Sequence, residues 1–128
     1  MDIKIKISLG ELVDKITILQ IKKEMIKDKS KIIKIEKELK HLEDILFSKF
    51  PKNKDLYEYL SNLKTINKKL WNIEDEIRKC EKLKNFDNNF IELARSVYIT
   101  NDKRFEIKNS INNIFSSEIV EVKSYEKY

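Results

Sequence analysis

The chain has 128 residues and a formal net charge of +5, with 38% charged and 41% hydrophobic residues. This length predicts one helical domain over residues 1–128, and no apolar run is long enough to insert into a membrane. One Gly and one Pro disfavour an all-β fold, which needs many turn residues. One Cys excludes a disulfide framework and a cysteine-built metal site, and one His disfavours a histidine-built metal site, so no metal is expected. With one Gly there is no Gly-rich phosphate loop, and no cofactor is expected either.

The basic excess gives little support to nucleic-acid binding. Of the 27 basic residues, 24 are Lys and three are Arg, and acidic residues alternate with Lys along the chain, as on solvated helix faces. No block of five basic residues and no nucleic-acid motif is present. Residues 1–8 lack the apolar core of a signal peptide, so the cytoplasm is the expected location.

The first elements follow directly from local patterns. Residues 2–7, DIKIKI, alternate between apolar and polar side chains, which predicts a short strand. Ser8 and Glu11 then match a capping box, which predicts a helix reaching about Asp28.

The rest of the chain is mostly helical by its apolar spacing. Helices are expected over residues 31–48, 55–84 and 88–115, with a break at Phe50-Pro51-Lys52-Asn53 and a second strand over 118–123. The pattern leaves open whether the last helix is continuous through Asn101. The expected fold is therefore mainly α: an antiparallel bundle of about four helices with short N- and C-terminal β-strands.

Charged side chains fall among the apolar side chains of the first expected helix. On a helical wheel, Glu11, Lys15 and Lys22 lie between two apolar arcs. Asp14 borders one arc, whereas Thr17 falls on the open face. Charges between two buried arcs are not expected to face only solvent.

The second half of the chain repeats this pattern. Glu74 and Arg78 border an apolar seam beside Trp71. In the last helix, Asn101, Arg104 and Lys108 share the apolar side, and Arg95 lies on another side near Tyr98.

Counted together, the inward candidates carry a surplus of three positive charges. The cations are Lys15, Lys22, Arg78, Arg104 and Lys108, and the carboxylates are Glu11 and Glu74. An uncompensated buried charge is costly, so the surplus favours an anionic ligand held by Arg forks and Lys ammonium groups.

Two other interpretations use the same residues. Lys and Arg side chains extend toward water from the edge of an apolar arc, and Glu74 and Arg78 are spaced to pair within one helix, so the charges would form a structural network. Alternatively, Glu11 and Asp14 lie on one helical turn and would hold Mg²⁺ together with Glu74 or Asp75, although Lys15 lies beside them.

Several motifs resemble those of a family of short, uncharacterised bacterial proteins, a domain of unknown function. They are SLGELVDKITIL at 8–19 with Lys22, LWNIED at 70–75 with Arg78, and LARSVYITNDKR at 93–104. The resemblance ends with Glu121, Lys123, Ser124, Tyr125 and Tyr128. Some members lie near genes for sugar transfer and surface polysaccharides, so the resemblance implies an accessory role in polysaccharide synthesis. A looser likeness to the all-helical chorismate mutases extends to architecture alone, since that family uses an Arg in its first helix and this chain has none before Arg78.

The residues together predict a polar, net-positive pocket between helices for an anionic small molecule, such as a phosphorylated sugar or a nucleotide sugar. Lys15, Lys22, Arg78, Arg104 and Lys108 would bind the anion, and Tyr98 and Asn101 would orient the ligand. Asp14, Trp71 and Arg95 would complete the ligand site, and Glu11 or Glu74 would be the acid or base if a reaction occurs. Whether the chain is an enzyme stays open. The alternative is a non-catalytic interaction or dimerisation module whose inward charges form a salt-bridge network, and a homo-oligomer is expected in either case.

Overall fold

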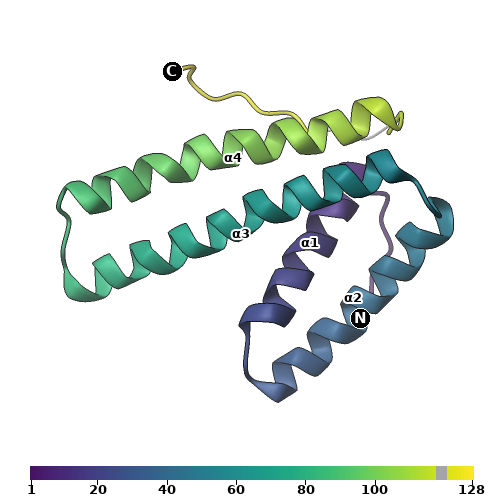
Figure 1. The fold of residues 1–128 in the computed structure, drawn as a ribbon, viewed down its shortest axis with the longest axis horizontal. Helices are drawn as coiled ribbons and strands as arrows, with labels where there is room; N and C mark the ends of the chain where they lie inside the picture. Colours follow the sequence, from purple (N-terminus) through teal and green to yellow (C-terminus); the bar gives the residue numbers. More distant parts are fainter. Residues whose placement is uncertain (118–120) are drawn as a thin grey trace.

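The described residues form four helices. The computed structural model describes residues 1–117 and 121–128, with α1 at Leu9–Met25, α2 at Lys29–Lys49, α3 at Lys54–Leu83 and α4 at Asn88–Ile114. The helices pair as two antiparallel hairpins, α1–α2 and α3–α4, and α1 packs against all three other helices (Figure 1). The predicted mainly α bundle is therefore confirmed.

Side-chain caps set the helix boundaries. The Ser8 hydroxyl accepts a hydrogen bond from the Glu11 amide at 3.1 Å, as the capping box predicts. The Asp28 carboxylate accepts from the Ser30 amide at 2.9 Å and so begins α2, which is why α1 ends at Met25 rather than near Asp28. Asp87 caps α4, which continues without a break through Asn101.

The core lies where α1 meets the other helices. Its buried side chains are Val13, Ile16 and Leu19 of α1, Leu39 and Leu46 of α2, Leu56 and Leu63 of α3, and Ile111 of α4. Burial of these side chains removes apolar surface from water and supplies the main drive for docking the two hairpins.

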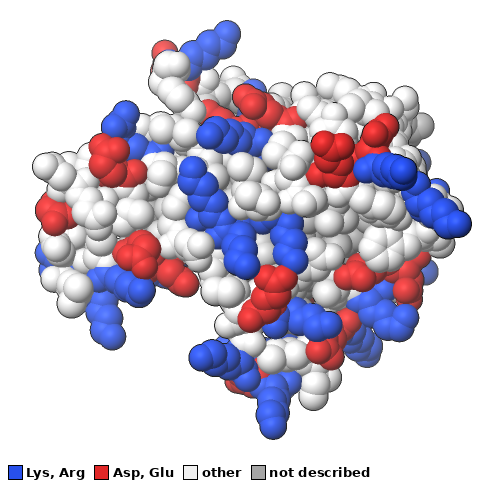
Figure 2. All heavy atoms as spheres, in the orientation of Figure 1, with Lys and Arg blue, Asp and Glu red and all other residues white. Residues whose placement is uncertain are grey.

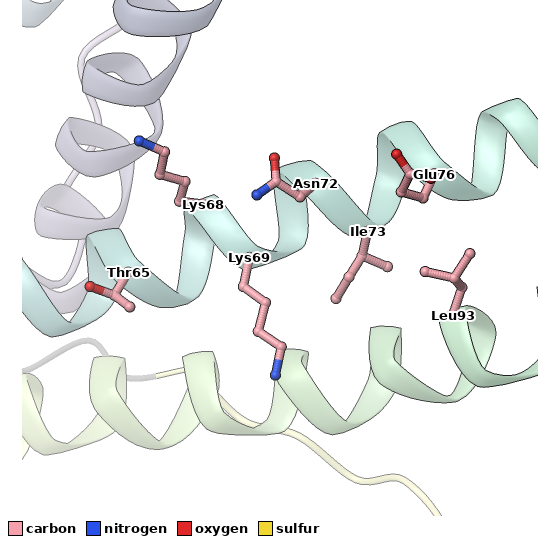
Figure 3. A pocket seen from close by; sticks show the side chains of 7 residues that line it. All are labelled: Thr65, Lys68, Lys69, Asn72, Ile73, Glu76 and Leu93. Atoms are coloured by element: carbon pink, nitrogen blue, oxygen red, sulfur yellow. The ribbon is translucent and has the colours of Figure 1, made fainter. Parts of the chain in front are cut away.

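The outer part of the α3–α4 hairpin, residues 74–97, extends beyond α1 and α2 (Figure 1) and is called the arm below. Within this described stretch only Cys80 is buried. Basic and acidic side chains are interspersed over the face of the molecule in Figure 2, rather than gathered in patches of one sign. A cleft of about 480 Å³ lies between α3 and α4 near the base of the arm, with Ile73 and Leu93 facing it from opposite sides (Figure 3).

The expected terminal strands are wrong in the part of the chain that the structure describes. Residues 2–7 form no strand and expose Ile3 and Ile5, and residues 121–123 are not in a strand either. Residues 118–120 of the second expected strand lie outside the described residues. The two ends of the chain lie on different sides of the bundle (Figure 1), and a two-stranded ribbon with no supporting sheet is marginal, so alternation alone does not produce one. None of the described helices is long and apolar enough to cross a membrane.

Candidate functional site

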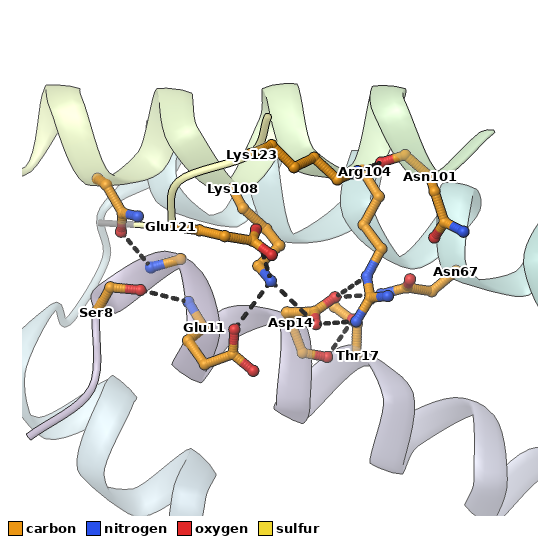
Figure 4. A network of polar contacts seen from close by, with 12 residues as sticks. Ser8, Glu11, Asp14, Thr17, Asn67, Asn101, Arg104, Lys108, Glu121 and Lys123 are labelled. Carbon is orange, nitrogen blue, oxygen red and sulfur yellow. Dashed lines mark hydrogen bonds and ion pairs between the residues drawn. The ribbon is translucent and has the colours of Figure 1, made fainter. Parts of the chain in front are cut away.

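A buried carboxylate joins α1 to α3 and α4. The Asp14 side chain is 1% exposed, and its Oδ1 accepts hydrogen bonds from Arg104 Nε at 3.0 Å and from Asn67 Nδ2 at 2.8 Å. Arg104 Nη2 donates to the other carboxylate oxygen, so the guanidinium holds Asp14 through both oxygens (Figure 4). The hydrogen bond with Asp14 raises the pKa of Arg104 against the opposing effect of burial.

Thr17 extends this network, although its wheel position predicts an open face. Its side chain is fully buried, accepts from Asn67 Nδ2 at 2.9 Å, and donates to the Asp14 carbonyl at 2.8 Å. The prediction is wrong because α3 packs over this side of α1, which the sequence of α1 alone does not indicate.

Lys108 forms the second part of the network. Its side chain is 6% exposed, and Nζ lies 2.9 Å from Glu11, 3.2 Å from Glu121 and 3.8 Å from Asp14 (Figure 4). Burial acts to lower the pKa of Lys108, but the hydrogen bond with Glu11 and the charge of Asp14 outweigh it, so the pKa is raised. The ammonium therefore stays charged at neutral pH.

Gly10 lets α1 and α4 approach closely beside this network. Its amide donates to Asn112 Oδ1 at 2.7 Å, and a Cβ built at Gly10 would lie 2.5 Å from the Lys108 carbonyl oxygen. Only glycine fits this crossing without a shift of the backbone.

A hollow of about 1050 Å³ lies between α4 and the C-terminal tail, residues 121–128. From α4 it is lined by side chains that include Tyr98, Asn101, Asp102, Arg104, Phe105 and Lys108, and from the tail by Glu121, Lys123, Tyr125 and Tyr128. The tail reaches α4 through the Glu121–Lys108 pair, an ion pair of 3.6 Å between Lys123 and Asp102, and a hydrogen bond from the Tyr128 hydroxyl to Asp102.

Residues 3–128, which contain both the network and the hollow, match a family of unknown function (DUF6165). The chain belongs to the DUF6165 family. The resemblance to a domain of unknown function is thereby confirmed. Neither the comparison with curated proteins nor that with solved structures gave a match.

In this DUF6165 chain, four of the predicted site residues meet in one network: Glu11, Asp14, Arg104 and Lys108. Tyr98 and Asn101 lie nearby and line the hollow. The remaining predictions do not join them.

Lys15 is exposed on α1, Lys22 is half-buried on the last turn of α1, and Trp71 is half-buried on α3. The other three predicted residues lie in the arm. Glu74 pairs with Arg78 at 3.5 Å, and Arg95 pairs with Glu92 at 3.0 Å, with all four side chains exposed.

The predicted surplus of positive charge is therefore not found. Two cations, Arg104 and Lys108, meet three carboxylates, those of Glu11, Asp14 and Glu121. Lys15 lies between two apolar arcs and Arg78 borders an apolar seam, which predicts that both face inward, yet both side chains reach solvent.

The Mg²⁺ interpretation fails for a related reason. Lys108 pairs with both Glu11 and Asp14, and Glu74 pairs with Arg78 in the arm. Among residues 1–117 and 121–128, no three His, Cys, Asp or Glu side chains are grouped to hold a metal ion.

Several residues of the site are not among those that the sequence predicts: Gly10, Thr17, Asn67, Asp102, Asn112, Glu121, Lys123 and Tyr128. Two signals were available for part of this set. Asn67 and Asn112 are polar residues within apolar helix faces, which is typical of buried hydrogen bonds. Glu121, Lys123 and Tyr128 belong to the resembling motif at the end of the chain.

Proposed function

We propose that the protein binds a small anionic molecule, a phosphorylated sugar or a nucleotide sugar, in the hollow between α4 and the tail. Lys108 carries the proposal: it is a buried, charged ammonium that lines the hollow, and one of its carboxylate partners belongs to the tail. A buried cation favours an anion because the lost hydration must be replaced by a counter-charge.

The anionic group of the ligand would take the place of the Glu121 carboxylate at Lys108. Glu121 is 41% exposed and lies on a segment without regular structure, so it regains water readily when displaced. Glu11, by contrast, lies in the first turn of α1 and stays beside Lys108. With Glu121 displaced, Arg104 and Lys108 balance Glu11 and Asp14, and the incoming phosphate meets no carboxylate surplus.

Aromatic side chains suit the sugar or base of such a ligand. Tyr98 and Tyr128 pack edge to face with ring centroids 5.3 Å apart, and Tyr125 lines the same hollow. The resemblance to proteins near surface-polysaccharide genes supports a cytoplasmic accessory role in that synthesis. Binding rather than catalysis is the function proposed, since Glu11 pairs with Lys108 and Glu74 pairs with Arg78 in the arm, which leaves neither predicted acid or base without a cationic partner.

The test is a thermal-unfolding and calorimetric titration with glucose 6-phosphate, UDP-glucose and, as the uncharged comparison, glucose. A ligand at about 100 times its Kd adds about 2.7 kcal/mol of stability, which raises Tm by several degrees. We expect a shift with the two phosphates only, its loss in Lys108→Met, and tighter binding in Glu121→Gln, which removes the competing carboxylate.

The control is Lys103→Met, which removes the same charge from an exposed position of α4. It is expected to bind like the wild type. No shift with either phosphate, or equal shifts in wild type and in both Lys variants, would overturn the proposal. Because Glu121→Gln changes an exposed side chain, it keeps the test valid if Lys108→Met does not fold.

A second candidate function is a helical interaction module that forms a homodimer. The observation that favours it is the exposure of Leu83, Phe86 and Ile91 around the end of the arm. Sedimentation velocity tests it: the candidate predicts a dimer that dissociates in Leu83→Ser/Phe86→Ser, and a monomer at all concentrations would eliminate it.

A further inference from the structure

The tail places two opposite charges on α4, and each meets a partner of the other sign. Glu121 pairs with Lys108, and Lys123 pairs with Asp102. The two α4 residues are six positions apart, about 9 Å along a helix, and an extended chain places residues 121 and 123 about 7 Å apart. The surface of α4 therefore binds a carboxylate, that of Glu121, and an ammonium group, that of Lys123, at the same time.

The ammonium of Lys123 lies in a site built from several groups. Nζ is 3.6 Å from Asp102 Oδ1 and 3.4 Å from the Asn101 carbonyl oxygen. It also lies 5.3 Å from the centroid of the Phe105 ring and 5.6 Å from that of Tyr125. A carboxylate, a carbonyl oxygen and aromatic faces are the groups with which proteins recognise ammonium ions.

Most of this ammonium site belongs to α4 and not to the tail. Asp102, Phe105 and the Asn101 carbonyl lie on the helix and stay in place if the tail moves. The tail is weakly anchored, since Val122, Tyr125 and Tyr128 are largely exposed and Lys123 is itself partly exposed. The pair between Lys123 and Asp102 is partly exposed on both sides, and such pairs add little to stability, so the ammonium of a ligand can take the place of Lys123.

We propose that the hollow binds a ligand that carries both an anionic group and an ammonium group, of the class of amino-sugar phosphates. Without this ligand, the Glu121 carboxylate occupies the anion position and the Lys123 ammonium occupies the ammonium position. This inference rests on the proposed function and adds the ammonium requirement to it. The phosphate replaces the Glu121 carboxylate at Lys108, and the ligand's ammonium replaces that of Lys123 between Asp102 and Phe105.

The experiment compares three ligands that differ at one position of the sugar: glucosamine 6-phosphate, N-acetylglucosamine 6-phosphate and glucose 6-phosphate. Kd values are measured by calorimetry with the full chain at pH 7 and constant ionic strength. We expect glucosamine 6-phosphate to bind about fivefold more tightly than the other two, the ratio that a partly exposed ion pair with a cation–π contact supplies.

Two variants of the ammonium site sharpen this result. Asp102→Asn should reduce the affinity ratio to near one, because it removes the charge that faces the ammonium. Lys123→Gln should strengthen binding of glucosamine 6-phosphate, because it vacates the site without changing α4. Glu106→Gln is the matched control for Asp102→Asn, since it removes a carboxylate from the same helix and the same hollow and should keep the preference.

The outcomes separate this inference from the function on which it rests. If all three phosphates bind equally, or if the preference survives in Asp102→Asn, the ammonium requirement is wrong and the anion site stands. If Glu106→Gln loses the preference as fully as Asp102→Asn, the effect is one of overall charge and the inference is again wrong. If no phosphate binds, the proposed function and this inference fail together.

Discussion

Charged side chains are arranged differently at the crossing of α1 with α4 and in the arm. In the arm, the pairs Glu74–Arg78, Glu76–Lys79, Glu81–Lys84 and Glu92–Arg95 are each formed within three or four residues and are exposed. At the crossing, Arg104 and Asp14 are 90 residues apart in sequence, and the carboxylate is buried. A pair within one helix adds little to stability, whereas loss of one partner from a buried pair leaves a charge without water.

The largest expected difference in stability is between two arginine substitutions, one at the crossing and one in the arm. Arg104→Ala leaves the Asp14 carboxylate buried without its guanidinium, so the free energy of unfolding should fall by about 3–5 kcal/mol. Arg78→Ala removes an exposed partner and should change it by about 0.5 kcal/mol or less. Urea unfolding followed by circular dichroism measures both. Similar losses in the two variants would show that burial does not distinguish the regions.

A smaller effect is expected from the close approach of α1 and α4. Gly10→Ala places a Cβ against the Lys108 carbonyl and should lower stability by about 1–3 kcal/mol, even though alanine favours helix more than glycine does. The same unfolding assay applies, with Lys15→Ala on the exposed side of α1 as control. A stabilised Gly10→Ala variant would mean that the crossing has room to relax.

Alkaline pH should weaken the ion pairs of Lys108 before that of Arg104, because a lysine ammonium loses its proton at a lower pH than a guanidinium. Because the pKa of Lys108 is raised in the folded state, its contribution to stability is complete below the unfolded-state pKa of about 10.4 and is lost as pH rises through the folded-state value. The difference in unfolding free energy between wild type and Lys108→Met should thus be constant from pH 7 to about pH 10 and shrink above it. If this difference in unfolding free energy grew as the pH rose above about 10, the pKa of Lys108 would be lowered and not raised in the folded state.

The smallest effect concerns the tail. The hydrogen bond with Asp102, together with its negative charge, raises the pKa of Tyr128 to about 12. Tyr128 should favour the folded tail fully below about pH 10 and lose this contribution toward pH 12. Phenolate absorbance should show a late titration step in the wild type that is missing in Tyr128→Phe. A wild-type titration in which every tyrosine ionises near pH 10 would mean that the tail is not held at Asp102.

Much of the fold is predictable from local sequence. The Ser8 cap, the break at Phe50-Pro51-Lys52-Asn53 and the Asp87 cap each depend on residues a few positions apart, and α1, α3 and α4 begin within one residue of the positions that they predict. The terminal strands are the exception, since a strand needs a partner elsewhere in the chain and alternation does not supply one.

The site is predictable only in part. A helical wheel identifies Glu11, Asp14, Arg104 and Lys108 as charges near apolar faces. It does not show which faces other helices cover, so Arg78 is counted as inward although it reaches water, and Thr17 is assigned to solvent although α3 buries it. The contacts of the tail depend on pairings across α4 that no periodicity encodes.

The long sequence separation between Arg104 and Asp14 also has a kinetic consequence. The α3–α4 hairpin is closed by a short turn, but the Asp14 contact requires both hairpins to be docked, after the entropy of closing a long loop has been lost. We therefore expect this contact to form after the rate-limiting step of folding. Substitutions there would mainly accelerate unfolding and leave the refolding rate nearly unchanged, so the crossing determines how long each molecule stays folded rather than how fast it folds.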